Sequence, residues 1–293
     1  MKRLLALLLT TLVIFSCDNE KKKPMKVEEK QGSRNELENT HGYAPVNGLE
    51  MYYEIHGNGE PLVLIHGGGS TIQTTFGNIL PLLAQHHKVI AMELQAHGHT
   101  KDRDTPESFQ QDAADVTALL SYLKINKADI IGFSNGGQTA MQIGISYPQH
   151  AKKLVIISAF YKRDGAMKGF FDGMGGANLG NMPAQLKEAY LKINNDSAGL
   201  QRMFDRDKTR MLQFKDWSEE DIASVKVPTL IIAGDKDVVT TEHAVKMSRL
   251  IPNAELMILP GTHGSFIGEV CSNVKDSKLP ALTVSAIEEF LAK

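Results

Sequence analysis

Gly132-Phe133-Ser134-Asn135-Gly136-Gly137 is the stretch of this 293-residue chain that decides its fold. It follows a strand-like run, residues 128–131, and precedes a helix-like run, residues 138–146. A strand that turns sharply into a helix projects the central Ser from the backbone, and glycines two residues to either side permit this crowded turn. The helix N-terminus adds backbone N–H groups and partial positive charge. The stretch therefore predicts a nucleophilic Ser134.

A serine hydroxyl needs a base to take its proton and a carboxylate to orient that base. Two later runs supply candidates. Residues 227–233 are mostly apolar and β-branched and lead to Asp235 and Asp237, whereas residues 254–259 lead to a turn that carries His263. Open α/β sheets bind ligands at the carboxyl ends of their strands, so these groups should meet the serine there. Either Asp can be the acid on this reasoning, because an Asp can also hydrogen-bond its own turn.

A loop rich in glycine is the candidate oxyanion hole. The strand-like residues 61–65 run into His66-Gly67-Gly68-Gly69. Residues without side chains let backbone N–H groups approach a developing alkoxide closely, and we expect one donor near Gly68. The second donor is expected to be the N–H of Asn135, the residue after the nucleophile. His66 is expected to brace the loop, which lacks the Lys-Ser/Thr of a phosphate loop.

Taken together and in this order, these segments resemble the α/β-hydrolase superfamily. The resemblance runs from about Gly42 to the C-terminus and implies an α/β fold. It implies a mostly parallel, doubly wound sheet with an N-terminal antiparallel hairpin and a helical cap insertion. It also implies Ser134 as nucleophile, His263 as general base and Asp237, in preference to Asp235, as the acid. No metal or organic cofactor is implied.

Alternating strand-like and helix-like runs support a mostly parallel sheet. The hairpin is expected at residues 43–46 and 50–55, joined near the turn dipeptide Asn47-Gly48. The other expected strands are residues 63–66, 89–92, 129–133, 153–158, 229–233 and 255–259, and the expected helices are residues 106–123, 136–147, 241–250 and 282–292.

The alternation stops at about residues 160–217, where we place the cap insertion. This segment is rich in Gly, Met and Phe. A cap covers the nucleophile, excludes water and shapes the substrate pockets. Its Met and Phe side chains are expected to form an adaptable apolar lining, and its charged residues to lie mostly on the solvated outer face.

Residues 92–100 are similar to the loop after the fourth strand of the family, usually Asp-x-Arg-Gly-His-Gly-x-Ser. This chain has Glu93, Gln95, Ala96 and Thr100 at positions where the family has Asp, Arg, Gly and Ser. The loop is structural in the family, so these departures bear on local packing rather than on the chemistry.

The N-terminus is predicted to carry a targeting signal. Lys2 and Arg3 precede a short apolar run that ends at Cys17, so residues 1–16 resemble a bacterial lipoprotein signal peptide with Cys17 as the lipidated residue. An ordinary secretory signal is the alternative. Residues 17–41 are charged and read as a disordered, lipidated tether, followed by the hydrolase domain at 42–293. The expected location is the cell envelope, at a bacterial membrane.

Composition limits the partners. The formal net charge of −2 offers no basic field for nucleic acid. If Cys17 is acylated, Cys271 has no disulfide partner and is expected to be a packed thiol. A metal site built from His97, His99 and His263 is conceivable, but motifs such as H-E-x-x-H are absent, and no metal is predicted. The sequence does not indicate the oligomeric state.

The predicted function is hydrolysis of a small or medium carboxylic ester or lactone through an acyl-enzyme. A C–C bond hydrolase, an aminopeptidase or a perhydrolase would use the same three residues. The alternative that is not an enzyme is a surface lipoprotein that binds a ligand without turnover. Such a protein would have no need of Ser134, Asp237 and His263 together.

Overall fold

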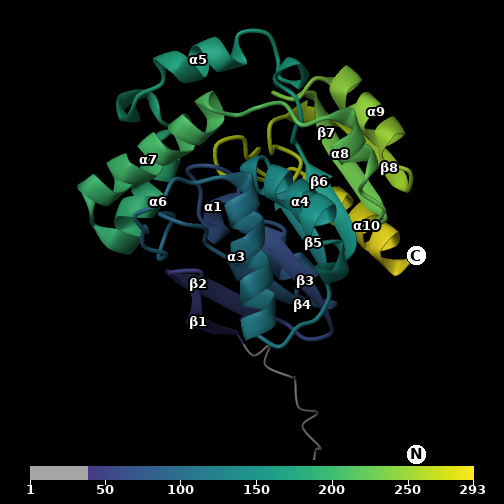
Figure 1. The fold of residues 1–293 in the computed structure, drawn as a ribbon, viewed down its shortest axis with the longest axis horizontal. Helices are drawn as coiled ribbons and strands as arrows, with labels where there is room; N and C mark the ends of the chain where they lie inside the picture. Colours follow the sequence, from purple (N-terminus) through teal and green to yellow (C-terminus); the bar gives the residue numbers. More distant parts are fainter. Residues whose placement is uncertain (1–38) are drawn as a thin grey trace, which may run out of the picture. The chain divides into compact units, whose positions relative to one another are not determined.

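An eight-stranded sheet forms the centre of residues 39–293, the part of the chain that the computed structural model describes. Its strand order is β1-β2-β4-β3-β5-β6-β7-β8 (Figure 1). The strands are β1 (Thr40–Val46), β2 (Leu49–His56), β3 (Glu60–Ile65), β4 (His87–Met92), β5 (Ala128–Phe133), β6 (Ala151–Ile157), β7 (Thr229–Lys236) and β8 (Ala254–Thr262). The predicted signal peptide, Cys17 and nearly all of the predicted tether lie outside the described residues.

The antiparallel part of the sheet lies at its N-terminal edge. β1 pairs with β2 and β2 with β4 in antiparallel register, and the remaining neighbours pair in parallel. The turn between β1 and β2 places Asn47 at φ 46° and Gly48 at φ 83°, as the Asn-Gly pair predicts. The mostly parallel sheet and its N-terminal hairpin are therefore confirmed, with β1 beginning at Thr40, slightly before the predicted start.

The longer helices α3, α4, α9 and α10 were predicted close to their observed bounds, whereas the short α1 and α2 were not. The helices are α1 (Ile72–Phe76), α2 (Leu80–Leu83), α3 (Phe109–Tyr122), α4 (Asn135–Ser146), α5 (Phe170–Gly176), α6 (Ala184–Asn194), α7 (Ser197–Leu212), α8 (Glu219–Ala223), α9 (Thr241–Leu250) and α10 (Leu279–Ala292). None of these described helices is long and apolar enough to cross a membrane.

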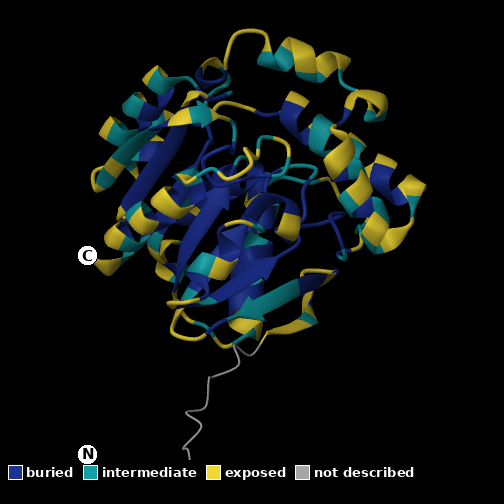
Figure 2. Cartoon of the chain, turned by 180° about the vertical axis from the view of Figure 1, so that it is seen from behind, coloured by how far each residue is buried: buried dark blue, intermediate teal, exposed yellow. Residues whose placement is uncertain are grey.

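Helices cover both faces of the sheet. Val63 and Ile65 of β3 pack into one core with α3, α4 and α9, whereas Leu62 and Leu64 pack into a second core with α1, α2 and α10. Successive strand residues point to opposite faces, so an apolar run such as residues 62–65 is buried on both sides. Figure 2 shows the buried strands enclosed by helices that expose their outer faces. The sheet is therefore doubly wound, as predicted.

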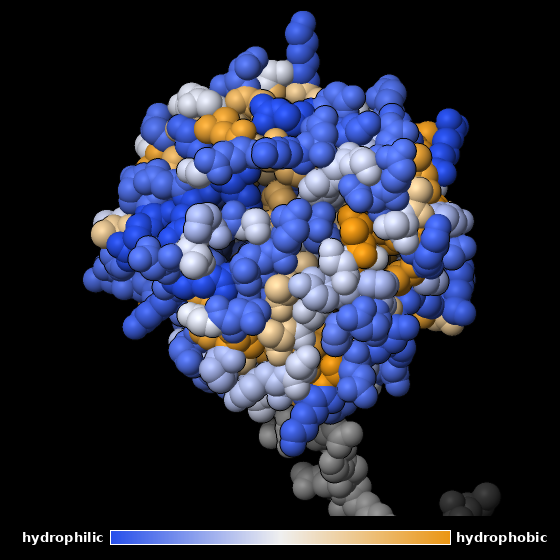
Figure 3. All heavy atoms as spheres, viewed as in Figure 1, coloured by the Kyte–Doolittle hydropathy of each residue, from blue (hydrophilic) through white to orange (hydrophobic). Residues whose placement is uncertain are grey.

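The chain between β6 and β7 is helical and contains α5, α6, α7 and α8. Figure 1 shows α5, α6 and α7 beyond one end of the parallel strands. Leu186 and Tyr190 of α6 pack with Leu200 and Met203 of α7 in a small separate core. The surface in Figure 3 is mostly hydrophilic, with apolar side chains in small scattered groups. This helical insertion therefore has its own core and lies near the strand ends where the site is predicted.

Candidate active site

Ser134 lies at a strained turn between β5 and α4. Its backbone has φ 53° and ψ −120°, outside the common region for a residue with a side chain. A Cβ at Gly132 would lie 2.0 Å from the carbonyl oxygen of Gly136, and a Cβ at Gly136 would lie 2.1 Å from that of Ile65. Only glycine fits either position, because no side chain can occupy such a short gap to backbone. The two glycines of the motif are therefore required by close packing.

His263 joins the serine to a buried carboxylate. Its Nε2 lies 3.1 Å from Ser134 Oγ, and its Nδ1 lies 2.7 Å from Asp237 Oδ1. The Asp237 side chain is completely buried, whereas that of His263 is 29% exposed. The structure thus brings together the three side chains singled out in the sequence, from the ends of β5, β7 and β8.

Asp237, rather than Asp235, contacts the imidazole. Its Oδ2 accepts hydrogen bonds from Ser158 Oγ at 2.5 Å and from the backbone N–H of Gly234 at 3.1 Å. Burial alone would raise the pKa of Asp237, but hydrogen bonds from His263, Ser158 and the backbone, with the charge of His263, outweigh it and lower the pKa. Asp235 is exposed and accepts from the turn at Gly261, the alternative role considered for it.

Two backbone N–H groups beside Ser134 have no hydrogen-bond partner in the described residues. They belong to Gly68, after β3, and to Asn135, the first residue of α4. His66 braces the glycine loop: its Nδ1 bonds the carbonyl of Gly67 at 2.7 Å and its Nε2 accepts from Leu94 N–H at 3.0 Å. Burial lowers the pKa of His66 to about 3, so the ring is neutral, as this pair of bonds requires.

A cavity of about 320 Å³ opens onto this site. Ser134 and His263 line it together with Gly68 and Asn135. The insertion supplies most of its apolar wall, chiefly Phe170, Met174, Met182, Leu186, Phe204 and Met211. The hydroxyl and the two N–H groups therefore face an apolar cavity, whose lining includes Met and Phe side chains as the composition of the insertion predicts.

Comparison with known proteins agrees with this architecture. A family model described as alpha/beta hydrolase fold matches residues 60–180. The structure of a serine hydrolase involved in carbazole degradation (CarC enzyme) has a TM-score of 0.71 at 24% identity and covers 87% of this chain and 99% of its own. The enol-lactonase from Burkholderia xenovorans LB400 has a TM-score of 0.66 at 19% identity, covering 86% and 100%. The chain has the α/β-hydrolase fold.

Serine hydrolase BPHL of Homo sapiens is 29% identical over 235 residues, which cover 74% of this chain and 78% of that protein. Other curated relatives are 35% identical over 117 residues, and those matches span only 34% of their length. Relatives named as hydrolases, together with the α/β-hydrolase fold, support an enzyme of the hydrolase class.

One part of the site was missed in the sequence. Asp207 of α7 reaches into the cavity, and its Oδ2 accepts from Gly69 N–H at 2.6 Å and from His97 Nε2 at 2.9 Å. Its Oδ1 accepts from Asn135 Nδ2 at 3.2 Å and from Arg210. The expectation that the charges of the insertion face solvent is therefore wrong for Asp207 and Arg210, whose side chains are only 14% and 3% exposed.

His97 carries a positive charge beside Asp207. Burial alone would lower its pKa, but the charge and hydrogen bond of Asp207 outweigh burial and raise it to about 9. Both ring nitrogens face acceptors, Nδ1 the carbonyl of Gln95 at 2.8 Å and Nε2 the carboxylate at 2.9 Å, which is closer to Nε2 than the N–H of Gly69 at 3.2 Å. Burial alone would raise the pKa of Asp207, but the positive charges of His97 and Arg210 outweigh burial and lower it. The two side chains therefore form a buried ion pair.

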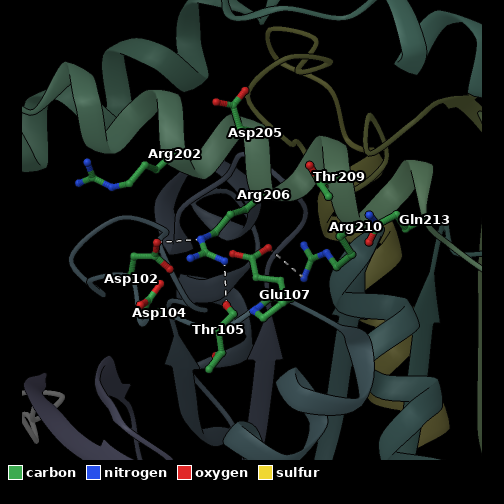
Figure 4. A pocket seen from close by; sticks show the side chains of 11 residues that line it. Asp102, Asp104, Thr105, Glu107, Arg202, Asp205, Arg206, Thr209, Arg210 and Gln213 are labelled. Carbon is green, nitrogen blue, oxygen red and sulfur yellow. Dashed lines mark hydrogen bonds and ion pairs between the residues drawn. The ribbon is translucent and has the colours of Figure 1, made fainter.

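A polar groove on the other side of α7 shows how the helix is attached. The cavity there, about 420 Å³, lies between α7 and residues 102–107. Figure 4 shows Arg206 reaching Asp102 and Thr105, and Arg210 turned toward Glu107. The Arg206–Asp102 bond measures 2.7 Å. Successive arginines of α7 therefore fasten the insertion to the loop before α3.

In the loop of residues 92–100, the residues that differ from the usual family sequence form hydrogen bonds of their own. Glu93 is buried, and its carboxylate accepts from the backbone N–H of His99 at 2.6 Å and from its ring at 2.8 Å. Thr100 Oγ1 donates to the carbonyl of Glu93 and accepts from Tyr52 N–H. Ala96 adopts φ 63°, a left-handed conformation that the glycine of the family would adopt without strain.

His97, His99 and His263 do not converge on one point, because each bonds a different carboxylate. Cys271 is exposed, so the prediction of a packed thiol is wrong. Partial desolvation of its sulfur and the neighbouring Glu269 raise the pKa of Cys271 to about 12, which keeps it as a thiol at neutral pH. Neither feature supplies a second reactive centre.

The buried ion pair predicts loss of stability at alkaline pH. The pKa of His97 rises from 6.5 to about 9 on folding, so its stabilisation is complete below about pH 6.5 and is lost as pH rises through about 9. The contribution is at most about 3 kcal/mol. Thermal unfolding should show a larger fall in Tm between pH 7.5 and 9.5 for the wild type than for His97→Gln.

The control is His86→Gln, which changes an exposed histidine and should keep the wild-type pH dependence. Burial raises the pKa of Glu107 to about 7 against the charges of Arg210 and His97, so His97→Gln also raises the pKa of Glu107, and His86→Gln does not. Equal slopes of Tm against pH for the wild type and His97→Gln would contradict the assignment of charge to His97.

Proposed function

We propose that this protein is a serine hydrolase that cleaves small to medium carboxylic esters or lactones. The observation that carries the proposal is a single imidazole, His263, placed between the hydroxyl of Ser134 and the buried carboxylate of Asp237. Activation of a serine requires this relation of nucleophile, base and orienting acid. The free N–H groups of Gly68 and Asn135 stand next to the hydroxyl, where charge would develop.

In the proposed mechanism, His263 Nε2 takes the proton of Ser134 as its Oγ attacks the substrate carbonyl. The N–H groups of Gly68 and Asn135 bind the oxyanion, and His263 then protonates the leaving alcohol. Asp237 keeps the proton of the imidazole on Nδ1 and stabilises the imidazolium. Water then attacks the acyl carbon as His263 takes its proton. The bond to Ser134 Oγ breaks, His263 returns the proton to that oxygen, and the acyl group leaves as a carboxylic acid.

The lining of the cavity favours a neutral, apolar acyl or alcohol group. Asp207 is the only carboxylate among the described residues that line it, and four donors already occupy its two oxygens. A free amino terminus would need an unengaged carboxylate to bind it. The lining of this cavity therefore favours an ester or lactone over an aminopeptidase substrate, whereas the carboxylate of Glu269 lines a second cavity beside Ser134 and His263. A substrate panel that adds vinylogous diketones and aminoacyl amides to esters and lactones tests this choice.

Replacement of the nucleophile is the first test of the proposal. Ser134→Ala should abolish labelling by a fluorophosphonate probe and hydrolysis of p-nitrophenyl butyrate, because no other described hydroxyl contacts His263. The matched control is Ser146→Ala, at the exposed end of the same helix, which should label like the wild type. Unchanged labelling of Ser134→Ala would remove the proposal, and a folded wild type without turnover would favour the ligand-binding alternative.

The two acids at the end of β7, Asp235 and Asp237, offer a second test with a matched pair. Asp237→Asn keeps the shape of the side chain but favours the wrong imidazole tautomer, and should lower kcat about 10³- to 10⁴-fold. Asp235→Asn, two residues away and without contact to His263, should stay within about threefold of the wild type. Steady-state kinetics on one ester decide the matter, and similar losses in both variants would refute the assignment of Asp237.

The cell-envelope location is also proposed, from residues 1–17 alone. The acyl chain on Cys17 would hold the enzyme at a bacterial membrane. In a bacterial host, the full chain should incorporate radiolabelled palmitate and sediment with membranes. Cys17→Ser should lose both properties, whereas Cys271→Ser should keep them. Label that persists in Cys17→Ser, or is lacking in the wild type, would contradict lipidation at this residue.

A further inference from the structure

Asp207 connects the two halves of the proposed oxyanion hole. Its Oδ2 lies 2.6 Å from the backbone nitrogen of Gly69, in the loop after β3. Its Oδ1 lies 3.2 Å from Nδ2 of Asn135, at the start of α4. A Cβ at Gly68 would lie 2.5 Å from that same Nδ2 and 3.2 Å from Asp207 Oδ2. One carboxylate from the insertion therefore packs directly against the two residues whose N–H groups are the proposed donors.

We propose that Asp207 is a positioning residue that fixes the oxyanion hole, so that the helical insertion takes part in setting the rate of the reaction as well as in shaping the cavity. The inference rests on the proposed function. Because Asp207 binds the N–H of Gly69, that group is unavailable to substrate and the preceding N–H of Gly68 is left facing the cavity. Because Asp207 also binds the side chain of Asn135, it holds the second donor, the backbone N–H of Asn135, at a fixed position relative to Gly68.

Two neighbouring cations, His97 and Arg210, compensate the negative charge of Asp207, which would otherwise oppose catalysis. A lone carboxylate so near the oxyanion would raise the energy of the transition state in an apolar cavity. Here the carboxylate contacts His97, with a ring that is 1% exposed, and Arg210, with a side chain that is 3% exposed. Arg210 also binds Asp112 through Nη1 at 2.6 Å. The anion therefore acts mainly through hydrogen-bond geometry.

The position of Asp207 is held from both sides. Arg206, one residue before it, bonds Asp102 at 2.7 Å (Figure 4). Arg210, one turn later, is buried against Asp112. These two attachments stop α7 from turning or sliding along the loop before α3. A carboxylate on a helix anchored in this way can hold the glycine loop at Gly69, beyond the part that His66 braces.

The test compares Asp207→Ala and Asp207→Asn with Asp205→Ala, an exposed acid on the same helix. We expect Asp207→Ala to lower kcat about tenfold to a hundredfold while KM stays within about threefold. Asp207→Asn keeps one acceptor for Gly69 but cannot also accept from Asn135 and Arg210, so its loss should be smaller. The affinity for a trifluoromethyl ketone, which forms an oxyanion on Ser134, should fall in parallel with kcat/KM.

Far-UV circular dichroism and Tm establish that each variant is folded, and Asp207→Asn provides the answer if Asp207→Ala does not fold. The inference is overturned if a folded Asp207 variant keeps kcat within about twofold of Asp205→Ala. It is also overturned if KM rises while kcat is unchanged. That result would show that the variant displaces the wall of the cavity and weakens substrate binding, without disturbing the oxyanion hole.

Hydrogen exchange at the amide of Gly69 separates this inference from the proposed function. The Gly69 N–H has two acceptors, Asp207 Oδ2 at 2.6 Å and His97 Nε2 at 3.2 Å. In the wild type and in Asp205→Ala the shorter bond to the carboxylate should protect the amide, and in Asp207→Ala, where only the longer contact remains, it should exchange at least tenfold faster. If the wild type has no Ser134-dependent turnover, the proposed function fails, and this exchange alone decides whether Asp207 holds the loop. Unchanged exchange at Gly69 would overturn the inference whatever the activity.

Discussion

The close crossing of α4 over the end of β3 is the constraint on which the site depends. A Cβ on Gly136 would lie 2.1 Å from the carbonyl oxygen of Ile65, so the first turn of α4 touches the backbone of the neighbouring strand. This contact places Ser134 and Asn135 against the loop that contains Gly68. The strained φ of Ser134 costs on the order of 1–3 kcal/mol, which the packed sheet around it must offset. A looser crossing would separate the hydroxyl from the two N–H groups.

Two buried carboxylates serve the site, and their surroundings differ. Asp237 is held largely by its own strand end, through the N–H groups of Gly234 and Val238, and it faces one titratable partner, His263. Asp207 is held by groups from four separate segments and faces two cations. Burial opposes ionisation in both, and the donors overcome it. Asp237 is therefore positioned largely by local contacts, whereas the groups that hold Asp207 come together only in the assembled fold.

This difference explains what the sequence could predict. Strands, the hairpin and the grouping of Ser134 and His263 with an acid follow from local patterns: apolar β-branched runs, an Asn-Gly turn and residues at strand ends. The choice of Asp237 over Asp235 follows from the family resemblance. Helical spacing places Asp207 on the buried face of α7, four residues from Met203 and four from Met211, but it does not indicate which groups the carboxylate meets there. The short helices α1 and α2 have too few residues for a periodic signal.

The insertion consequently influences the cavity in two physically distinct ways. α5 has no buried residue, and side chains such as Phe170 and Met174 contribute shape and apolar surface to the wall. α7 is fixed by buried ion pairs and places a charge network beside the glycine loop. A substitution in α5 therefore changes the space available to substrate without altering the electrostatics near Ser134. A substitution at Asp207 alters the network and the glycine loop but leaves the apolar wall in place, so α5 bears on substrate fit and Asp207 of α7 on turnover.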